Sequence, residues 1–312
     1  MSESGMVHDG RSAIATAPNV SRDRNLDWID RKEYPFRSHY LTTEHGDLHY
    51  VDEGSGEMIL FVHGNPTWSF MYRHLIKGLR GGFRCVAPDH IGFGLSDKPF
   101  DVSYLPQFHA ENLARFIEQR GLKDITLVIH DWGGAIGMSY ALDHPENVKR
   151  LIVLNTSFWS VKGIKEAEDF SRYLGGPVGR FLCRYFNAFP RFILPYAFGD
   201  RSKLSRSVHR HYIRPFPTPD SRKGTWVFPK AIIGESDWLA SLWAKRDRLA
   251  DKPVLVLWGL KDPAFSMREL DRWKTAFPNL EAQTFSDVGH FVAEELGRDA
   301  IGPVEAFLHA YP

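Results

Sequence analysis

Short apolar runs separated by helical patterns are the feature that most restricts how this 312-residue chain can fold. The runs lie at residues 58–62, 85–87, 125–129, 151–154 and 254–257. Short apolar runs bounded by turn-forming residues are typical of strands buried on both faces of a parallel sheet. Helical periodicity lies between or after them, at residues 71–79, 108–120, 135–142 and 267–277, and again from residue 291. The alternation predicts an open α/β sheet with right-handed crossovers.

The same alternation of apolar runs and helical patterns divides the chain into parts. Residues 1–34 are polar and lack periodicity, which predicts a flexible N-terminal arm. Residues 38–42 and 48–52 alternate in polarity and predict a hairpin at the start of the sheet. Between residues 156 and 247 the apolar runs stop and aromatic helical pieces replace them, at 181–189 and 237–243. We therefore expect a core of residues 35–155 and 248–312, with residues 156–247 inserted as a helical cap.

Composition excludes several classes of function. Lys and Arg total 39 against 38 Asp and Glu, so a formal charge of +1 gives no reason to expect nucleic acid or an anionic membrane as partner. The sequence holds no run of about 20 apolar residues, so it predicts no membrane span, and the first 30 residues do not resemble a secretory signal. Cys85 and Cys183 form neither a disulfide framework nor a CxxC pair. We expect a cytoplasmic protein.

Aromatic residues make up 13% of the chain, which is a high share for a globular protein. From composition alone, a large aromatic core explains them better than a deep apolar pocket does. Much of the excess falls in residues 156–247. Part of it is therefore expected to build an apolar pocket under the cap.

The segment from Leu127 to Ala135 carries the most chemical information. The apolar strand ends at His130, one residue, Asp131, occupies a sharp turn, and Gly133 and Gly134 let a helix begin directly against the strand. This is the pattern of a nucleophile elbow, which raises one side chain above the sheet at a helix N-terminus. The raised residue is more often Ser, and a lone Asp at such a position is usually a helix cap.

Three further segments give Asp131 a chemical context. The strand ending at Val62 continues as His-Gly-Asn65-Pro, whose turn amide, together with that of Trp132, predicts an oxyanion hole. Asp262 follows the strand at 254–257, and His290 precedes the last helical stretch. The chain order of nucleophile, acid and histidine is that of α/β-hydrolases.

This set of motifs resembles the haloalkane dehalogenases. The resemblance spans residues 35–312 and is carried by Asn65 in HGNP, Asp131 and Trp132 in HDWGG, Asp262 in WGLKDP and His290 in GHF. It implies the α/β-hydrolase fold, with a mostly parallel eight-stranded sheet flanked by helices and an inserted helical cap. Epoxide hydrolases of the same fold share HDWG but usually carry an aromatic residue at the position of Asn65.

The position of the acid implies a subfamily. Some dehalogenases carry this acid, as Glu, after the preceding strand, where the present chain has Asn155 and no carboxylate. Asp262 is therefore the expected acid. The combination of Asn65 with this late Asp resembles the third dehalogenase subfamily, which has an Asp-His-Asp triad and an Asn-Trp halide pair.

The resemblance implies a two-step reaction on a small apolar halogenated substrate. Asp131 displaces the halide and becomes an alkyl ester, while the Trp132 indole and the Asn65 amide stabilise the departing ion. His290, oriented by Asp262, then deprotonates a water that hydrolyses the ester. The scheme requires no metal or other cofactor, the products are an alcohol and a halide ion, and the protein is expected as a monomer or homo-oligomer.

Four aromatic or cyclic residues are candidates for the substrate pocket. Phe158 follows the cap entry, Pro215 and Phe216 lie in a proline-rich cap loop, and Phe291 adjoins His290. Ordinary core packing explains each of them equally well.

Two alternatives remain open from the sequence. An epoxide hydrolase would use the same Asp131, His290 and Asp262, with two cap tyrosines as proton donors; Tyr173, Tyr185, Tyr196 and Tyr212 are available for that role. A non-catalytic ligand-binding protein on a hydrolase scaffold is the alternative from another class. Loss of the nucleophile or of the base would indicate it, and both residues are present.

Overall fold

The computed structural model describes residues 26–312, and its centre is one eight-stranded sheet. The order across the sheet is β1-β2-β4-β3-β5-β6-β7-β8. Strands β1, β2 and β4 are antiparallel neighbours, and all other neighbours are parallel. The strands are β1 His39–Thr43, β2 Gly46–Glu53, β3 Glu57–Val62, β4 Phe83–Pro88, β5 Ile125–His130, β6 Val148–Leu154, β7 Val254–Gly259 and β8 Leu280–Phe285. The expected fold class is confirmed.

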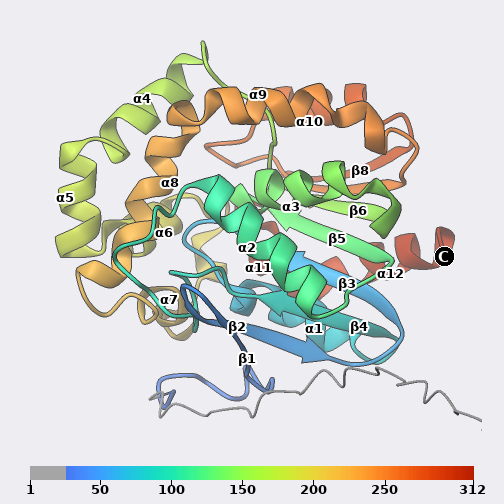
Figure 1. Cartoon of the computed structure of the whole chain (residues 1–312), viewed down its shortest axis with the longest axis horizontal. Coiled ribbons are helices and arrows are strands. Elements are labelled where there is room, and N and C mark those ends of the chain that lie inside the picture. The colour runs from blue at the N-terminus through green and yellow to red at the C-terminus, as the bar shows by residue number, and fades with distance from the viewer. Residues whose placement is uncertain (1–25) are drawn as a thin grey trace, which may run out of the picture.

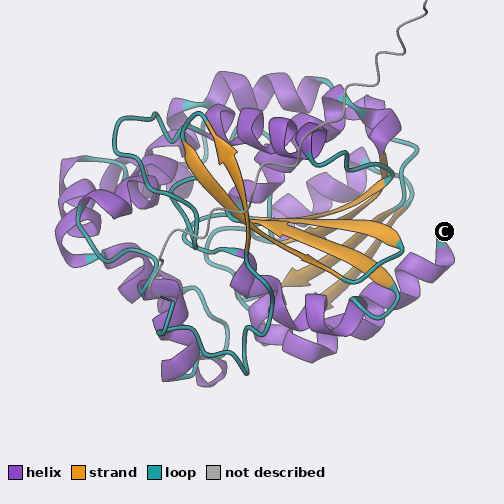
Figure 2. Ribbon diagram, turned by 60° about the horizontal axis from the view of Figure 1, so that its bottom comes forward, coloured by secondary structure: helices purple, strands orange, loops and turns teal. Residues whose placement is uncertain are grey.

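Helices cover both faces of this sheet (Figure 2). Alternate residues of the central strands point to opposite faces: in β3, Leu60 and Val62 enter one apolar core, whereas Ile59 and Phe61 enter the other. The first core is closed by α2 Pro106–Gln119, α3 Trp132–Asp143, α9 Ser236–Ala244 and α10 Met267–Ala276. The second is closed by α1 Arg73–Leu79, α11 Val292–Leu296 and α12 Ile301–Ala310.

The remaining helices form the cap, which Figure 1 shows gathered at one end of the sheet. The cap helices are α4 Lys165–Leu174, α5 Pro177–Phe186, α6 Leu194–Tyr196, α7 Arg206–Ile213 and α8 Lys223–Gly234. A π-helical turn, η3 Phe189–Ile193, joins α5 to α6. The remaining regular elements are short 3-10 helices: η1 Ser69–Tyr72, η2 Pro145–Asn147, η4 Arg201–Lys203, η5 Asp220–Arg222, η6 Arg246–Leu249 and η7 Gly297–Ala300.

Helix α9 lies differently from the expectation. The expected cap extended to residue 247, but α9 packs against α3 and places Leu239 and Leu242 in the first core. The reason is topological, because a right-handed crossover from β6 to its parallel neighbour β7 needs a helix on the face of the sheet. The cap helices α4–α8 therefore precede the crossover helix.

Of the expected N-terminal arm, residues 1–34, the structure describes residues 26–34, and these are packed against the domain. Residues 1–25 lie outside the described part of the chain, but Ile29 and Tyr34 are buried in the second core. The Tyr34 hydroxyl lies 2.6 Å from Ser69 Oγ, and the Asp30 amide donates to His211 Nε2 at 3.0 Å. Residues 26–34 thus pack onto the folded domain and reach the cap.

A buried ion pair fastens the cap to the core beneath it. Arg73 of α1 makes a two-pronged contact with Glu294 of α11, with both N–O distances 2.6 Å. The Tyr212 hydroxyl of α7 donates to the same carboxylate. Because all three side chains are buried, this network ties α1, α11 and the cap together in one place.

Candidate active site

The topology of the sheet sets the location of the site. From β3 the chain moves through α1 to β4 on one side, and then through α2 to β5 on the other side of β3. In open α/β sheets the crevice at the carboxyl ends of the strands where the order reverses is the usual ligand site. Asn65 follows β3 and Asp131 follows β5, so both lie at this crevice.

Asp131 forms the expected sharp turn between β5 and α3. Its backbone angles, φ 50° and ψ −129°, are unusual for a residue other than glycine and indicate local strain. The turn is possible because glycines allow close approach: a Cβ at Gly133 would collide with the Val62 carbonyl oxygen, and one at Gly64 with the Asp131 carboxylate. The Thr156 hydroxyl donates to the Asp131 carbonyl and holds the turn from β6.

Two backbone amides converge on the Asp131 carboxylate. The Asn65 N–H donates to Oδ1 at 2.7 Å, and the Trp132 N–H also donates to this carboxylate. These are the two amides that the sequence predicts as an oxyanion hole. In the resting state they hold the Asp131 side chain in place.

His290 lies between two carboxylates. Its Nδ1 is 2.9 Å from Asp262 Oδ2, and its Nε2 is 3.5 Å from Asp131 Oδ2. Asp262 is held in turn by the Asn155 side-chain amide at 2.8 Å and by the Ala264 N–H at 2.7 Å. The structure therefore brings together three residues that are far apart in the sequence and that follow three different strands, β5, β7 and β8.

Electrostatics couples these groups. Burial alone lowers the pKa of His290, but the charge of Asp262 and the contacts with Asp131 outweigh it and raise that pKa to about 10. Burial alone raises the pKa of Asp131, but the contacts with His290, together with His130 and the Trp132 amide, more than reverse this effect, so the pKa lies below its ordinary value. Both shifts favour the charged forms, a protonated imidazole between two carboxylates.

A cavity of about 760 Å³ opens above these residues. Asn65, Asp131, Trp132, His290 and Phe291 all line it. Most of the remaining lining is apolar and comes from the cap and the strand ends, including Trp159, Ile164, Phe170, Leu174, Ile193, Ile232, Leu239 and Phe265. A pocket of this size and polarity suits a small apolar ligand.

The polar side chains of Asn65 and Trp132 are available to such a ligand. The Trp132 ring stacks on Phe228 at 5.2 Å between centroids, which fixes its orientation at the cavity wall. The Asn65 Oδ1 atom is buried and has no hydrogen-bond partner within residues 26–312. A buried acceptor left unpaired is costly, so this oxygen is a natural place for a water or another hydrogen-bond donor to bind.

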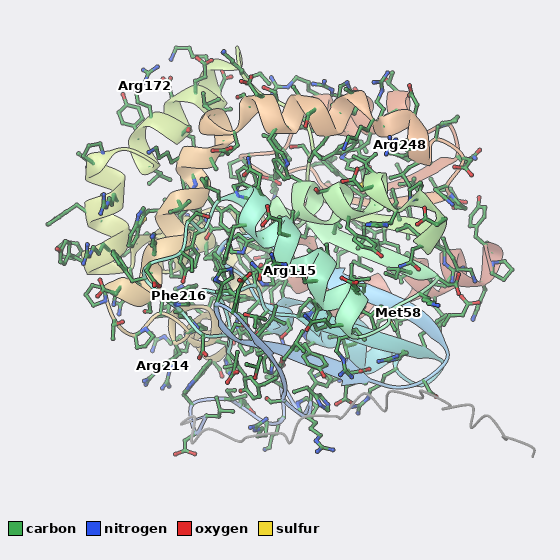
Figure 3. All side chains as sticks on the ribbon, viewed as in Figure 1. Met58, Arg115, Arg172, Arg214, Phe216 and Arg248 are labelled. Carbon is green, nitrogen blue, oxygen red and sulfur yellow. The ribbon has the colours of Figure 1, made fainter. Side chains whose placement is uncertain are left out.

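Three of the predicted pocket residues do not line the cavity. Phe158 points into the core, with its ring 5.0 Å from that of Trp273. Pro215 and Phe216 lie in the connection between α7 and α8 (Figure 3), where Phe216 packs edge-on against Phe93 at 5.9 Å. For these three residues, core packing, which the sequence left open as the alternative to substrate contact, is what the structure shows.

Several residues of the site were not predicted from the sequence. Phe265 stacks on the His290 ring at 5.6 Å, with an interplanar angle of 14°. His130 lies 2.8 Å from the His290 carbonyl oxygen through Nε2, and burial lowers the pKa of His130 to about 4, so its neutral ring donates this bond. Asn155 supports Asp262 through its side-chain amide. Their position could have indicated Asn155 and His130 from the sequence, since both residues lie at strand ends beside the elbow.

The tyrosines are poorly placed for proton donation. Among the residues that line the cavity in residues 26–312, Tyr196 is the single tyrosine. The Tyr212 hydroxyl is buried against Glu294, and Tyr173 and Tyr185 are exposed on the outside of the cap. A pair of tyrosines facing Asp131, as an epoxide hydrolase would need, is therefore not formed by these residues.

The described residues also bear on metals, thiols and membranes. Within residues 26–312 no cluster of three or more His, Cys, Asp or Glu residues has the arrangement of a metal site. Cys85 and Cys183 are unpaired and buried, and burial raises their thiol pKa values to about 12 and about 11. No helix in this part of the chain is long and apolar enough to cross a membrane.

Comparison with known proteins places this site in a family context. Residues 57–295 match the family described as alpha/beta hydrolase fold. Haloalkane dehalogenase 2 of Mycobacterium tuberculosis is 36% identical over 281 residues, covering 89% of this chain and 97% of its own. A cis-3-alkyl-4-alkyloxetan-2-one decarboxylase of Shewanella oneidensis is 35% identical over 284 residues, covering 88% and 89%.

Solved structures agree with these relatives. The haloalkane dehalogenase DatA of Agrobacterium tumefaciens superposes with a TM-score of 0.80 at 27% identity, covering 88% of this chain and 97% of its own. DbeA of Bradyrhizobium elkani gives 0.78 at 26% identity, covering 88% and 99%. The chain therefore belongs to the α/β-hydrolase fold family, among proteins related to the haloalkane dehalogenases.

Proposed function

We propose that this protein hydrolyses haloalkanes to an alcohol and a halide ion through a covalent ester on Asp131. The observation that carries the proposal is the Asp131 carboxylate, held by two backbone amides beneath an apolar cavity with His290 directly beside it. A carboxylate attacks a saturated carbon without prior deprotonation. Its low pKa keeps it ionised for this attack.

The departing halide needs hydrogen-bond donors. A halide ion has little affinity for a proton, so N–H groups stabilise it better than a general acid does. The Trp132 indole and the Asn65 side-chain amide both line the cavity beside Asp131 and provide such donors. We assign them as the halide-binding pair.

Ester formation prepares the second step. Alkylation removes the negative charge of Asp131, which is one of the causes that raise the pKa of His290. The pKa of His290 therefore falls once the ester forms, and the ring releases its proton and becomes a general base. It then activates a water that attacks the ester carbonyl, while the amides of Asn65 and Trp132 stabilise the oxyanion.

Asp262 is the acid of this proposed triad. It contacts His290 directly, whereas the position occupied by Glu in other dehalogenases holds Asn155, which donates to Asp262. This arrangement supports assignment to the third dehalogenase subfamily.

Halide release provides the direct test. We expect the purified protein to release bromide from 1-bromobutane or 1,2-dibromoethane, and Asp131→Asn to release none. The His290→Phe variant should accumulate an alkyl adduct on Asp131 that is visible by mass spectrometry. A folded protein that releases no halide across a broad substrate panel contradicts the proposal, and an unmodified Asp131 in His290→Phe contradicts the two-step scheme.

A second candidate is decarboxylation of a cis-3,4-dialkyl oxetan-2-one. It is favoured by the relatives of Shewanella oneidensis and Xanthomonas campestris, which carry that activity in their names at 35% and 34% identity. Here Asp131 attacks ring carbon C4 and breaks the C4–O bond, which frees a carboxylate on C3. Loss of CO₂ then forms the C3=C4 double bond and expels Asp131. The sum is lactone to alkene plus CO₂, without water.

Isotope labelling separates the two candidates. In H₂¹⁸O, ester hydrolysis places ¹⁸O in the Asp131 carboxylate, because water attacks its carbonyl carbon. Decarboxylation leaves the Asp131 oxygens unlabelled and yields an alkene. Turnover of a dialkyl oxetanone without bromide release from alkyl bromides would reverse our order of preference.

A further inference from the structure

Helix α5 presents its apolar face to solvent. Val178, Phe181, Leu182, Tyr185 and Phe186 follow the i, i+3, i+4, i+7, i+8 spacing with which helices pack against a core. Each of these side chains is nevertheless between 39% and 71% exposed. Gly179 and Cys183 form the buried side of the helix instead. Contiguous exposed apolar surface of this kind marks an interaction site.

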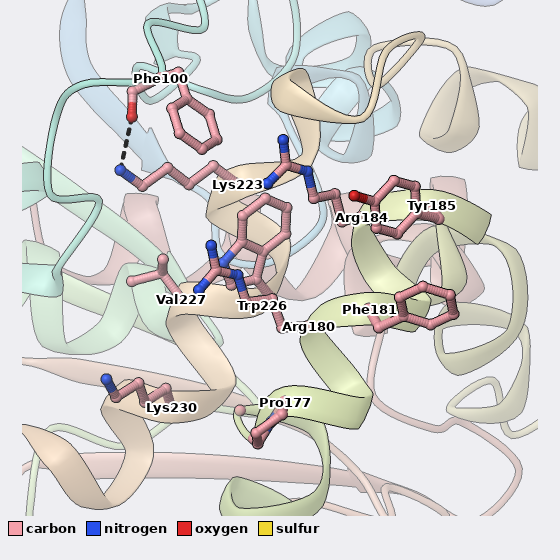
Figure 4. Close-up of a pocket in the computed structure, with 12 residues that line it drawn as sticks. Phe100, Pro177, Arg180, Phe181, Arg184, Tyr185, Lys223, Trp226, Val227 and Lys230 are labelled. Carbon is pink, nitrogen blue, oxygen red and sulfur yellow. Dashed lines mark hydrogen bonds between the residues drawn. The ribbon is translucent and has the colours of Figure 1, made fainter.

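A basic pocket adjoins this apolar face. A cavity of about 850 Å³ between α5 and α8 is lined by Arg180, Arg184, Lys223 and Lys230, and none of the described residues that line it is acidic. Figure 4 shows three of these cations grouped around the Trp226 ring, with Phe181 and Tyr185 extending from α5 away from that ring. Phe181 and Tyr185 also line the pocket, so the apolar face and the basic pocket are continuous.

The cations of this pocket are only partly neutralised. Arg184 pairs with Asp220 at 2.7 Å, and Lys223 donates to the carbonyl oxygens of Phe100 and Val102, both at 2.7 Å. Arg180 and Lys230 form no ion pair within residues 26–312. The formal charge of +1 is an average over the whole chain and conceals this local excess of positive charge.

We propose that this face of the cap binds the surface of an anionic lipid bilayer. Phosphate groups complement the basic pocket, while the aromatic and aliphatic side chains of α5 enter the boundary between headgroups and acyl chains. Aromatic side chains beside Arg and Lys are the composition that favours this interface. The near-neutral total charge led us to expect no membrane partner, and the local charge changes that expectation.

The bilayer face extends to the mouth of the active-site cavity. Phe192 of η3 and Tyr196 of α6, the elements that follow α5 in the chain, are also more than 60% exposed. Tyr196 and Phe170 also line the cavity above Asp131. Surface binding would place this opening at the bilayer, where apolar molecules dissolve. The proposal does not depend on which reaction Asp131 performs.

Vesicle co-sedimentation of the full chain tests the proposal. The protein should bind vesicles of phosphatidylcholine mixed with phosphatidylglycerol, and binding should weaken as salt rises. The variant Arg180→Gln/Lys230→Gln should bind on the order of 20-fold more weakly, because each cation near an anionic surface contributes roughly fivefold. Phe181→Ser/Phe186→Ser should also bind more weakly. Arg248→Gln, at the other end of the molecule (Figure 3), should bind like the wild type.

The controls separate lipid binding from unfolding and from self-association. All substituted side chains are exposed, so unchanged thermal unfolding should accompany the loss of binding. Absence of wild-type binding to the mixed vesicles overturns the proposal, and so does an equal loss in Arg248→Gln. The sedimentation coefficients of the wild type and of Phe181→Ser/Phe186→Ser should be equal without lipid. A lower coefficient for the variant would identify the α5 face as a contact between copies of the chain and would also overturn the proposal.

Discussion

Replacing Asp262 by Asn separates the two proposed chemical steps. Asp262 is surrounded by donors: Oδ2 accepts from His290 Nδ1 at 2.9 Å and from Asn155 at 2.8 Å, and Oδ1 accepts from the Ala264 amide at 2.7 Å. An Asn side chain carries an NH₂ group in place of one oxygen. In either orientation that NH₂ group faces a donor, so at least one buried hydrogen bond is lost: one if it replaces Oδ1 and two if it replaces Oδ2.

The size of the effect follows from these contacts. One unpaired buried donor costs about 1–3 kcal/mol of stability. The variant also removes the charge that most strongly raises the pKa of His290, so the base is weaker and less well oriented. General-base assistance contributes about 10²–10⁴-fold, and we expect ester hydrolysis to slow by that factor. Alkylation should persist, because Asp131 keeps both backbone amides.

Rapid-quench measurement of bromide release distinguishes the steps. The Asp262→Asn variant should release a burst of one bromide per protein and then turn over slowly, while mass spectrometry shows the alkyl adduct. Asp287→Asn is a matched control, since this exposed carboxylate lies in the same region and, among residues 26–312, forms an ion pair only with Lys261, at 3.3 Å. A first turnover as slow as the later ones, or an equal loss in Asp287→Asn, would refute the reasoning.

Three further predictions concern the site and its support. Because the pKa of His290 rises from 6.5 to about 10 on folding, its stabilising contribution is complete below pH 6.5 and disappears as pH approaches 10. The thermal midpoint measured by scanning calorimetry should fall across that range, and fall less in His290→Phe. Arg73→Ala leaves Glu294 buried without its partner and should cost about 3–5 kcal/mol in urea unfolding. Arg80→Ala, at a more exposed pair, should cost about 1 kcal/mol or less. Gly64→Ala places a Cβ 2.7 Å from the Trp132 amide, and it should lower halide release by about 10²–10³-fold in steady-state assays.

The residues of the site that the sequence predicted best are those that follow the ends of the parallel strands. Parallel strands bring their carboxyl ends to one edge, so polar residues after β3, β5 and β7 had to meet once the sheet was recognised. Strand β8 was not apparent as an apolar run, because it lies at the edge of the sheet and four of its six residues are exposed. Its place comes from pairing with β7.

The cavity wall was harder to predict than the catalytic machinery. Phe158 and Trp159 are neighbours and both aromatic, yet Trp159 lines the cavity while Phe158 fills the core. The choice between them depends on how the cap packs, which no local pattern encodes. Phe216 illustrates the same difficulty, since its partner Phe93 belongs to a distant loop.

The network of Arg73, Glu294 and Tyr212 has a mechanical consequence. It fastens α7 to the core, and a second set of bonds does the same for α6: the His290 amide donates to the Ala197 carbonyl oxygen at 2.9 Å, and the Gly199 amide to Glu295 at 2.9 Å. Helix α4 packs chiefly on α5 and α8, which belong to the cap themselves. Helices α4 and α5 therefore reach the core chiefly through α8, whose Phe228 lies in the first core, and we expect motion of the cap to be largest at α4 and α5.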